Sequence, residues 1–188
     1  MASYTRPEFD EYFMRIALAV RDRADCVGRK VGAVVAIGEP LRLVAAGYNG
    51  TPKGMKNCSS GGCARCKNRE VANAGVGYDV CVCVHGEENA ILSAAKQGIR
   101  LEGARLYTTM SPCFICLREA ISCGIEKIRY LHDWKPRADK SLESQYARLK
   151  REIDIAQVPV DDDKADWAMG RLGEPPRIAE AGRRRRGA

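Results

Sequence analysis

The sequence lacks the features of a membrane-inserted or secreted protein. No apolar run reaches the roughly 18 residues that a membrane-spanning helix needs. The first residues, MASYTRPEFDEYF, contain no short basic region that leads into an apolar one, so they do not resemble a signal peptide. We therefore expect a soluble, cytoplasmic protein.

Histidine is scarce, whereas cysteine is abundant. The 188 residues include two histidines, His85 and His132, and nine cysteines. An odd number of cysteines without a secretion signal argues against a disulfide framework. Metal ligation is the better interpretation, and the shortage of histidine means that most metal ligands must be thiolates. The cysteines are Cys26, Cys58, Cys63, Cys66, Cys81, Cys83, Cys113, Cys116 and Cys123.

Positive charge is concentrated at the C-terminal end. The net charge is +7, and Arg183 to Arg186 supply four of the positive charges. Such a tail can bind nucleic acid, but it is more often solvated, so we do not expect a nucleic-acid partner. We expect one domain over residues 1–160 and a C-terminal extension over 161–188 with a disordered basic tail.

Hydrophobic periodicity predicts an α/β layered domain with a mixed sheet. A Cys- and Gly-rich insertion without clear periodicity, residues 49–79, interrupts the pattern, and a loop of that length needs a reason. The apolar runs of the first two strands suggest burial on both faces. Predicted helices cover residues 9–20, 88–98, 111–124 and 141–153, and predicted strands cover 31–37, 41–48, 104–110, 127–132 and 154–160.

Local signals add three finer expectations. Thr5 with Glu8 is a plausible capping box before the first helix. Ser111 is a candidate cap for the helix that follows it, with Pro112 in the first turn. Val80 to Val84 alternate with cysteines in a strand-like period of two, which changes to a helical period from Gly86 onward.

Two motifs with metal-binding chemistry lie where a predicted strand ends and a helix begins. His85 and Glu87 form H-x-E, and Cys113 and Cys116 belong to P-C-x-x-C. His85 and the two cysteines are candidate ligands for one zinc ion, which leaves a fourth position for water. Glu87 can then move protons, as in the zinc nucleobase deaminases that carry this paired signature. The alternative is a structural zinc with Cys81 or Cys83 as fourth ligand.

These motifs resemble a known family. The stretch CVHGEENAILSAAKQGIRLEGARLYTTMSPCFICLREAISCGIEKIRYL resembles the core of the cytidine and deoxycytidylate deaminases, and RKVGAVV and AAGYNGTPKG resemble the deoxycytidylate (dCMP) branch. The resemblance runs from about residue 12 to 167. It implies a three-layer α/β/α fold with a mixed central sheet and a zinc hydrolase, often hexameric, that converts dCMP to dUMP and ammonia.

The resemblance also implies roles for individual residues. His85, Cys113 and Cys116 would bind zinc, and Glu87 would be the catalytic proton shuttle. Asn49 would lie at the substrate sugar, and the Gly86 N–H would face the pyrimidine carbonyl. Lys30, beside the first strand, is a candidate for the substrate phosphate, although a solvated lysine is an equal alternative. His132 and Trp134 could stack on a base or simply pack against the next helix.

One departure from the family concerns substrate choice. The family usually has H-A-E, where this chain has Gly86. A neutral replacement is the simpler interpretation, and a roomier pocket that accepts a modified base is the alternative. Competing functions are deamination of a purine base, of tRNA or of single-stranded nucleic acid, and a non-enzymatic zinc-binding module. The last would leave Glu87 without a role.

A second set of cysteines lies in and around the insertion. Cys63-x-x-Cys66 has the spacing of a zinc knuckle, and a structural zinc would explain how an aperiodic loop stays ordered. The candidate ligands are Cys26, Cys58, Cys63 and Cys66, with Cys81 or Cys83 as an alternative ligand. Some relatives resemble this arrangement with a cysteine shortly before the catalytic histidine, which leaves the fourth ligand open. Free buried thiols are the competing interpretation.

Overall fold

A mixed five-stranded sheet forms the centre of the protein. The computed structural model describes residues 5–68, 77, 80–136 and 139–169. The strand order is β2-β1-β3-β4-β5, with β1 antiparallel to β2 and β3, and β3, β4 and β5 parallel to one another. The strands are β1 (Gly32–Ile37), β2 (Arg42–Tyr48), β3 (Ala104–Met110), β4 (Ile125–His132) and β5 (Asp154–Gln157).

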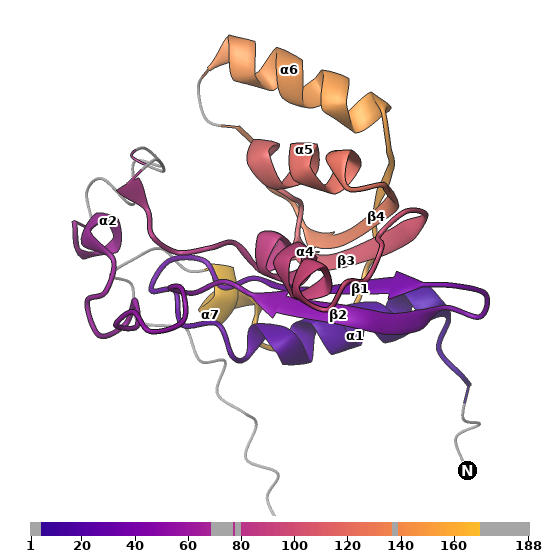
Figure 1. Cartoon of the computed structure of the whole chain (residues 1–188), viewed down its shortest axis with the longest axis horizontal. Coiled ribbons are helices and arrows are strands. Elements are labelled where there is room, and N and C mark those ends of the chain that lie inside the picture. The colour runs from indigo at the N-terminus through magenta and orange to yellow at the C-terminus, as the bar shows by residue number, and fades with distance from the viewer. Residues whose placement is uncertain (1–4, 69–76, 78–79, 137–138, 170–188) are drawn as a thin grey trace, which may run out of the picture.

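Helices cover both faces of this sheet (Figure 1). One face carries α1 (Phe9–Arg21), and the other carries α4 (Gly86–Lys96), α5 (Phe114–Ser122) and α6 (Lys140–Arg151). Two short helices, α2 (Ala64–Lys67) and α7 (Ala165–Met169), complete the helices of the described residues. The predicted three-layer α/β/α fold with a mixed sheet is therefore confirmed.

Burial explains why the central strands read as apolar runs. β1 and β3 are buried along almost their whole length, because β1 lies between β2 and β3 and helices cover both faces. β2 differs from the prediction, since residues such as Leu43 are exposed. It is an edge strand, so its apolar run did not indicate burial on both faces.

The predicted strand at Val80 to Val84 is wrong. The structure has only an isolated antiparallel bridge there, between Val84 and Gly50. Cys81 and Cys83 instead lie among other cysteines of the loops. Alternation alone therefore did not indicate a strand, because the segment has no neighbouring strand along its length.

The two predicted helix caps are also wrong. α1 begins at Phe9 with Glu8 as N-cap, and no side chain caps it. α5 begins at Phe114 with Cys113 as N-cap, so Ser111 and Pro112 precede the helix. The Cys113 backbone is extended, as is usual for an N-cap residue, and its side chain makes no capping hydrogen bond.

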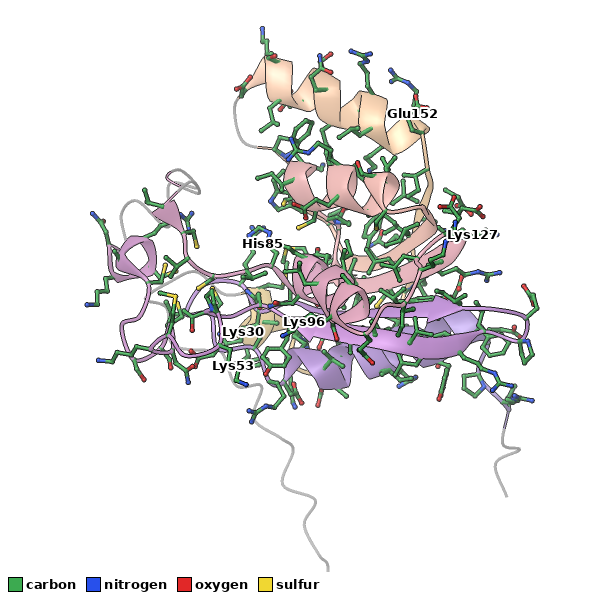
Figure 2. All side chains as sticks on the ribbon, viewed as in Figure 1. Lys30, Lys53, His85, Lys96, Lys127 and Glu152 are labelled. Carbon is green, nitrogen blue, oxygen red and sulfur yellow. The ribbon has the colours of Figure 1, made fainter. Side chains whose placement is uncertain are left out.

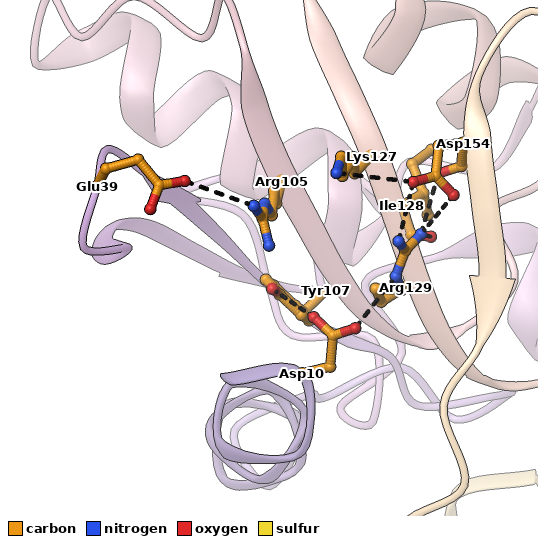
Figure 3. Close-up of polar contacts among 8 residues, drawn as sticks. All are labelled: Asp10, Glu39, Arg105, Tyr107, Lys127, Ile128, Arg129 and Asp154. Carbon is orange, nitrogen blue, oxygen red and sulfur yellow. Dashed lines mark hydrogen bonds and ion pairs between the residues drawn. The ribbon is translucent and has the colours of Figure 1, made fainter. Parts of the chain in front are cut away.

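A polar network fixes α1 to the far strands of the sheet (Figure 3). The Asp10 carboxylate on α1 accepts hydrogen bonds from the Tyr107 hydroxyl at 2.9 Å and the Arg129 guanidinium at 3.2 Å. Arg129 also forms a two-pronged pair with Asp154 of β5, with both contacts at 2.9 Å. Such fork geometry adds direction as well as charge, so it helps to set the position of β5 against β4.

The segment that ends in α7 packs back on the domain. Asp162 accepts two hydrogen bonds of 2.6 Å from Arg21, and its carboxylate lies 2.7 Å from the His132 ring. The Lys30 ammonium lies 4.8 Å from the centre of the Trp167 ring. The predicted basic tail, Arg183 to Arg186, lies outside the described residues.

No helix in the described part of the chain is long and apolar enough to cross a membrane.

Candidate functional site

Two helix N-termini bring the predicted ligands together. His85 is the N-cap residue of α4, and Cys113 is the N-cap residue of α5, both with extended backbone. The Glu88 carboxylate accepts a hydrogen bond from the His85 N–H at 3.4 Å, which helps to hold this turn. Cys116 follows within the first turn of α5 and is buried.

The three side chains meet at one point. The His85 Nδ1 atom lies 3.4 Å from the Cys113 sulfur and 3.4 Å from the Cys116 sulfur. All three candidate ligand atoms lie within 4.8 Å of one another. Two thiolates and one imidazole are a donor set that zinc prefers, and three protein ligands leave one position open. The residues present therefore fit a zinc ion.

The local electrostatics favour the ligating form of the sulfurs. Hydrogen bonding from Cys116, and then from His85, lowers the pKa of Cys113 to about 4. The positive N-terminal end of α5 acts in the same direction. The hydrogen bond with Cys113 raises the pKa of His85 to about 9. Metal binding would release that proton, because the imidazole ligates in its neutral form.

Glu87 is buried beside the three ligands. Its side chain lies in the first turn of α4, and the residue is 4% exposed. Burial raises its pKa from 4.5 to about 7. The Thr108 hydroxyl of β3 lies 3.3 Å from the Glu87 Oε1 atom and 3.1 Å from the Met110 carbonyl oxygen, and it can donate its one proton to either. A carboxyl group with a pKa near neutrality suits a residue that both accepts and donates protons.

A tyrosine from α6 braces the turn that carries Cys113. The Tyr146 hydroxyl donates to the Pro112 carbonyl at 2.7 Å and lies 3.1 Å from the Ser111 hydroxyl. The Ser111 N–H donates to the His132 carbonyl at 2.7 Å. Sequence reasoning missed Tyr146 and Thr108, because neither residue lies near the motifs in the sequence.

Asn49 and Gly86 lie against the same backbone segment. The Asn49 Oδ1 atom accepts from the Val31 N–H, and its Nδ2 atom donates to the Arg29 carbonyl, both at 2.8 Å. A side-chain amide has a second N–H, which suits a substrate hydroxyl. A Cβ atom at Gly86 would lie 2.9 Å from the Val31 carbonyl oxygen. The space that glycine leaves therefore faces Val31.

Other candidate residues have structural partners. Trp134 packs edge-on against Tyr146 with ring centres 5.3 Å apart, which agrees with packing against the next helix. His132 pairs with the buried Asp162. Lys30 lies over Trp167, and burial lowers its pKa. Of these, Lys30 stays a prediction for the substrate phosphate.

The remaining predicted ligands gather in one place, which we call the six-cysteine cluster. Figure 2 shows their sulfur atoms, in yellow, in the loops beside α2. Within the described residues, the predicted ligands Cys26 and Cys63 fall into different groups of four sulfurs. One group is Cys26, Cys58, Cys66 and Cys83, and the other is Cys63, Cys66, Cys81 and Cys83.

Comparison with known families and proteins gives a consistent result. Residues 7–132 match the model of the cytidine and deoxycytidylate deaminase zinc-binding region. The chain is 36% identical over 135 residues to the deoxycytidylate deaminase of Saccharomyces cerevisiae, a match that covers 72% of this chain and 41% of the yeast protein. The chain thus spans less than half the length of that relative.

Shorter proteins match over nearly their whole length. The deoxycytidylate deaminase of Mycobacterium phage D29 is 40% identical over 129 residues, which is 67% of this chain and 96% of the phage protein. The crystal structure of dCMP deaminase from the cyanophage S-TIM5 superposes with a TM-score of 0.60 at 25% identity. That superposition covers 82% of this chain and all of the cyanophage chain.

Proposed function

Since the chain belongs to the cytidine and deoxycytidylate deaminase family, we propose that it hydrolyses dCMP to dUMP and ammonia. The observation that carries this proposal is the burial of Glu87 beside the His85, Cys113 and Cys116 ligand set. A purely structural zinc site would give a buried carboxylate no task. Burying a carboxyl group that can carry charge costs free energy, so its presence here supports catalysis.

His85, Cys113 and Cys116 would hold the catalytic zinc. When bound, zinc would act as a Lewis acid that makes hydroxide available from water at neutral pH. The chain's own contribution is to orient this donor set at the ends of α4 and α5. Tyr146 keeps the turn before Cys113 in place through the Pro112 carbonyl.

Glu87 would move the protons of the reaction. With a pKa of about 7, its carboxyl group exists in both forms near neutral pH. It would take one proton from the attacking water and deliver it to the cytosine N3 atom, and then take a second from the new C4 hydroxyl and deliver it to the departing amine. The Thr108 hydroxyl contacts Oε1, so it orients the carboxyl group and leaves Oε2 for these transfers.

Substrate binding would use the backbone and Asn49. The Gly86 N–H lies at the start of α4 and would donate a hydrogen bond to the pyrimidine carbonyl oxygen. The free N–H capacity of the Asn49 amide suits the deoxyribose hydroxyl. Lys30 carries the charge that a 5′-phosphate needs, although this role requires the ammonium to leave the Trp167 ring.

Three further proposals concern the whole protein. We propose that the six-cysteine cluster holds structural zinc, because its donors are all sulfur and the loops that carry it have little regular structure. Reduced cysteines of this kind favour a cytoplasmic location. The family resemblance supports a homo-oligomer, for which a hexamer is the expected order.

Ammonia release from a substrate panel tests the main proposal. The panel contains dCMP, CMP, deoxycytidine, dCMP methylated on the cytosine base (5-methyl-dCMP), dAMP, guanine and tRNA. We expect activity on dCMP that is lost in Glu87→Ala and retained in Glu126→Gln, a change at an exposed glutamate of β4. Activity mainly on a modified or purine base would overturn the substrate, and inactivity of a zinc-loaded enzyme on every compound would overturn the catalytic function.

A further inference from the structure

The six-cysteine cluster contains two groups of four sulfurs with two members in common. Cys66 and Cys83 belong to both groups. One group is completed by two cysteines, Cys26 and Cys58, and the other by Cys63 and Cys81. Within each group, all sulfur atoms lie within 4.8 Å of one another. The arrangement is therefore that of two four-sulfur groups with two sulfurs in common, which is what two tetrahedral sites with a shared edge require.

We propose that this cluster binds two zinc ions bridged by the thiolates of Cys66 and Cys83. This inference rests on the proposal that the cluster holds zinc and specifies how many ions it takes. Each ion would have two terminal and two shared thiolate ligands. All six cysteines would then be ligands, and each ion would be four-coordinate and closed to substrate, as structural zinc requires.

The spacing of the sulfurs fits direct coordination. A Zn–S bond of about 2.3 Å in a tetrahedral site places the ligand sulfurs roughly 3.8 Å apart. The sulfurs of Cys63 and Cys81 lie 3.9 Å apart, and no two sulfurs within a group are more than 4.8 Å apart. Iron–sulfur clusters place sulfide between the metals, which separates the cysteine sulfurs further, so they fit less well.

A single zinc ion would leave part of the cluster unexplained. If it bound the group that contains Cys26 and Cys58, Cys63 and Cys81 would remain as adjacent free thiols against two thiolates. Cys63 is fully buried, so its thiol would not be a solvated side chain at the surface. A second ion gives both sulfurs a partner without moving the first four.

Backbone groups already point at the terminal sulfurs. The Gly28 N–H donates to Cys26, the Val27 N–H donates to Cys58, the Val82 N–H donates to Cys63 and the Cys83 N–H donates to Cys81. Each terminal ligand of the two proposed ions therefore has a backbone donor.

Nearby positive charges suit the charge of the proposed centre. Six thiolates with two Zn²⁺ ions carry a double negative charge. The charge of Arg65, which is 8% exposed, acts on the Cys81 thiol, and Lys30 is close enough for its charge to interact with Cys26 and Cys58. A buried anionic centre needs such compensation.

The centre would join three chain segments at the edge of the active site. The ligands come from the loop after α1, from the insertion around α2 and from the segment before α4. Gly50 and Val84 exchange backbone hydrogen bonds of 3.2 and 2.9 Å next to the cluster. His85 follows Val84 directly, so the two ions would hold the turn that carries a catalytic ligand.

Counting zinc in purified full-length protein is the first test. We expect three ions per chain, and two in Cys113→Ser, which lacks the catalytic ion. One ion in Cys113→Ser would overturn the bridged pair while leaving structural zinc intact. No zinc in that variant would overturn the structural zinc proposal itself. Deamination by the wild-type chain is a separate measurement, so failure of the dCMP proposal is distinguishable from either outcome.

Cadmium substitution of the wild-type chain tests the shared ligands without a mutation. With a spin-active cadmium isotope, two resonances of all-thiolate sites should show cadmium–cadmium coupling through the bridging sulfurs. Two uncoupled all-thiolate resonances, or a single one, would exclude the shared edge. The catalytic site should give a third resonance shifted by its nitrogen ligand.

Single substitutions distinguish terminal ligands from a cysteine outside the cluster. Cys63→Ser should lose one of the three zinc ions and abolish the cadmium coupling, because one ion loses a terminal ligand. Cys123→Ser is the matched control, since the Cys123 sulfur donates to the Ala120 carbonyl and belongs to neither group. It should retain three ions. Retention of three ions by Cys63→Ser would contradict the proposal.

Discussion

The two cysteine-rich regions place the same kind of donor atom in different surroundings. In one, Cys113 and Cys116 stand at the start of a helix with His85 and a buried carboxylate beside them. In the other, six sulfurs stand together in irregular loops. Three ligands leave a coordination position for chemistry, whereas four close the ion to substrate.

The supporting structure differs in the same way. The His85 site is attached to α4, α5 and the buried strand β3, whose residues belong to the main hydrophobic core. The six-cysteine cluster lies in segments with few regular elements, so metal binding would supply much of their order. The difference teaches that donor type alone does not separate a catalytic from a structural site. The neighbouring acid and the number of ligands do.

The largest expected effect is at Glu87, the buried carboxyl group beside the His85, Cys113 and Cys116 ligand set. Glu87→Gln should lower kcat for dCMP by roughly 10²- to 10⁴-fold, the usual contribution of general acid–base catalysis. Zinc content should be unchanged in both regions, because Glu87 is not a ligand. Steady-state kinetics with metal analysis measure both quantities. A near-normal kcat for zinc-loaded Glu87→Gln would mean that the carboxyl group beside the His85 site has no catalytic role.

The second prediction concerns the segment that joins the two regions. Residues 22–31 carry Cys26 and lead to Val31 beside Gly86. The buried Arg21–Asp162 pair holds the beginning of this segment. Asp162→Asn should lower the free energy of unfolding by about 3 kcal/mol, because it leaves Arg21 buried without its partner.

The contribution of the Arg21–Asp162 pair to the free energy of unfolding falls at low pH. Burial alone would raise the pKa of Asp162, but hydrogen bonds from Arg21 and His132 outweigh it and lower the pKa from 3.8 to about 2. The pair therefore contributes about 2 kcal/mol above pH 4, and this is lost as the pH falls toward 2. Denaturant unfolding at several pH values should show the loss in the wild type only.

The control for this prediction is Asp22→Asn. Asp22 pairs with Lys164 in an exposed setting, so its removal should cost far less stability than Asp162→Asn. Both Asp162→Asn and Asp22→Asn should keep their full zinc content if the two metal regions are anchored independently. A loss of zinc from Asp162→Asn would show that the joining segment couples them.

In both regions, the sequence predicts the residues that lie close together along the chain. H-x-E and P-C-x-x-C each lie at the start of a helix, so a few adjacent residues fix the ligand and its neighbours. The order of helices and strands was predictable for the same reason, because burial imposes a period on each element.

The rest depends on contacts between distant segments. Thr108 reaches Glu87 from β3, and Tyr146 reaches Pro112 from α6. Cys66 and Cys83 belong to both groups only because three chain segments meet, and the spacing of cysteines along the sequence does not reveal such a meeting. The alternation at Val80 to Val84 was misleading, because two cysteines of the six-cysteine cluster alternate there with valines and produce the period of a strand.

A smaller effect is expected at Thr108. Thr108→Val keeps the shape of the side chain but removes the hydroxyl that contacts Glu87. We expect kcat/KM for dCMP to fall by about tenfold, which corresponds to roughly 1.4 kcal/mol for one hydrogen bond to a charged group. The hydroxyl lowers the pKa of Glu87, so its removal should move the acidic limb of the kcat/KM profile to higher pH.

Thr109→Val is the neighbouring control for this role. The Thr109 hydroxyl accepts from the Gly32 N–H at 3.1 Å and makes no contact with Glu87 among the described hydrogen bonds. Its replacement should affect stability but leave the pH profile in place. Identical pH profiles for Thr108→Val and the wild type would mean that the hydroxyl only fills space.

The smallest effect is expected at Gly86, where the catalytic region departs from its family. In Gly86→Ala, the added Cβ would lie 2.9 Å from the Val31 carbonyl oxygen, closer than ordinary van der Waals contact, so the Val31 backbone must shift. Gly86 is the first residue of α4, so the helix-interior preference for alanine does not offset that cost. The free energy of unfolding should therefore fall by about 1 kcal/mol, as in an overpacked core.

Substrate choice distinguishes the two interpretations of Gly86. Because the methyl group would face Val31, the ratio of kcat/KM for dCMP to that for methylated dCMP should be the same in Gly86→Ala and the wild type. A roomier base pocket would instead make the methylated substrate fall selectively in Gly86→Ala. A selective fall would place the glycine at the base, and an equal ratio would place it at the joint between α4 and the segment that leads to the six-cysteine cluster.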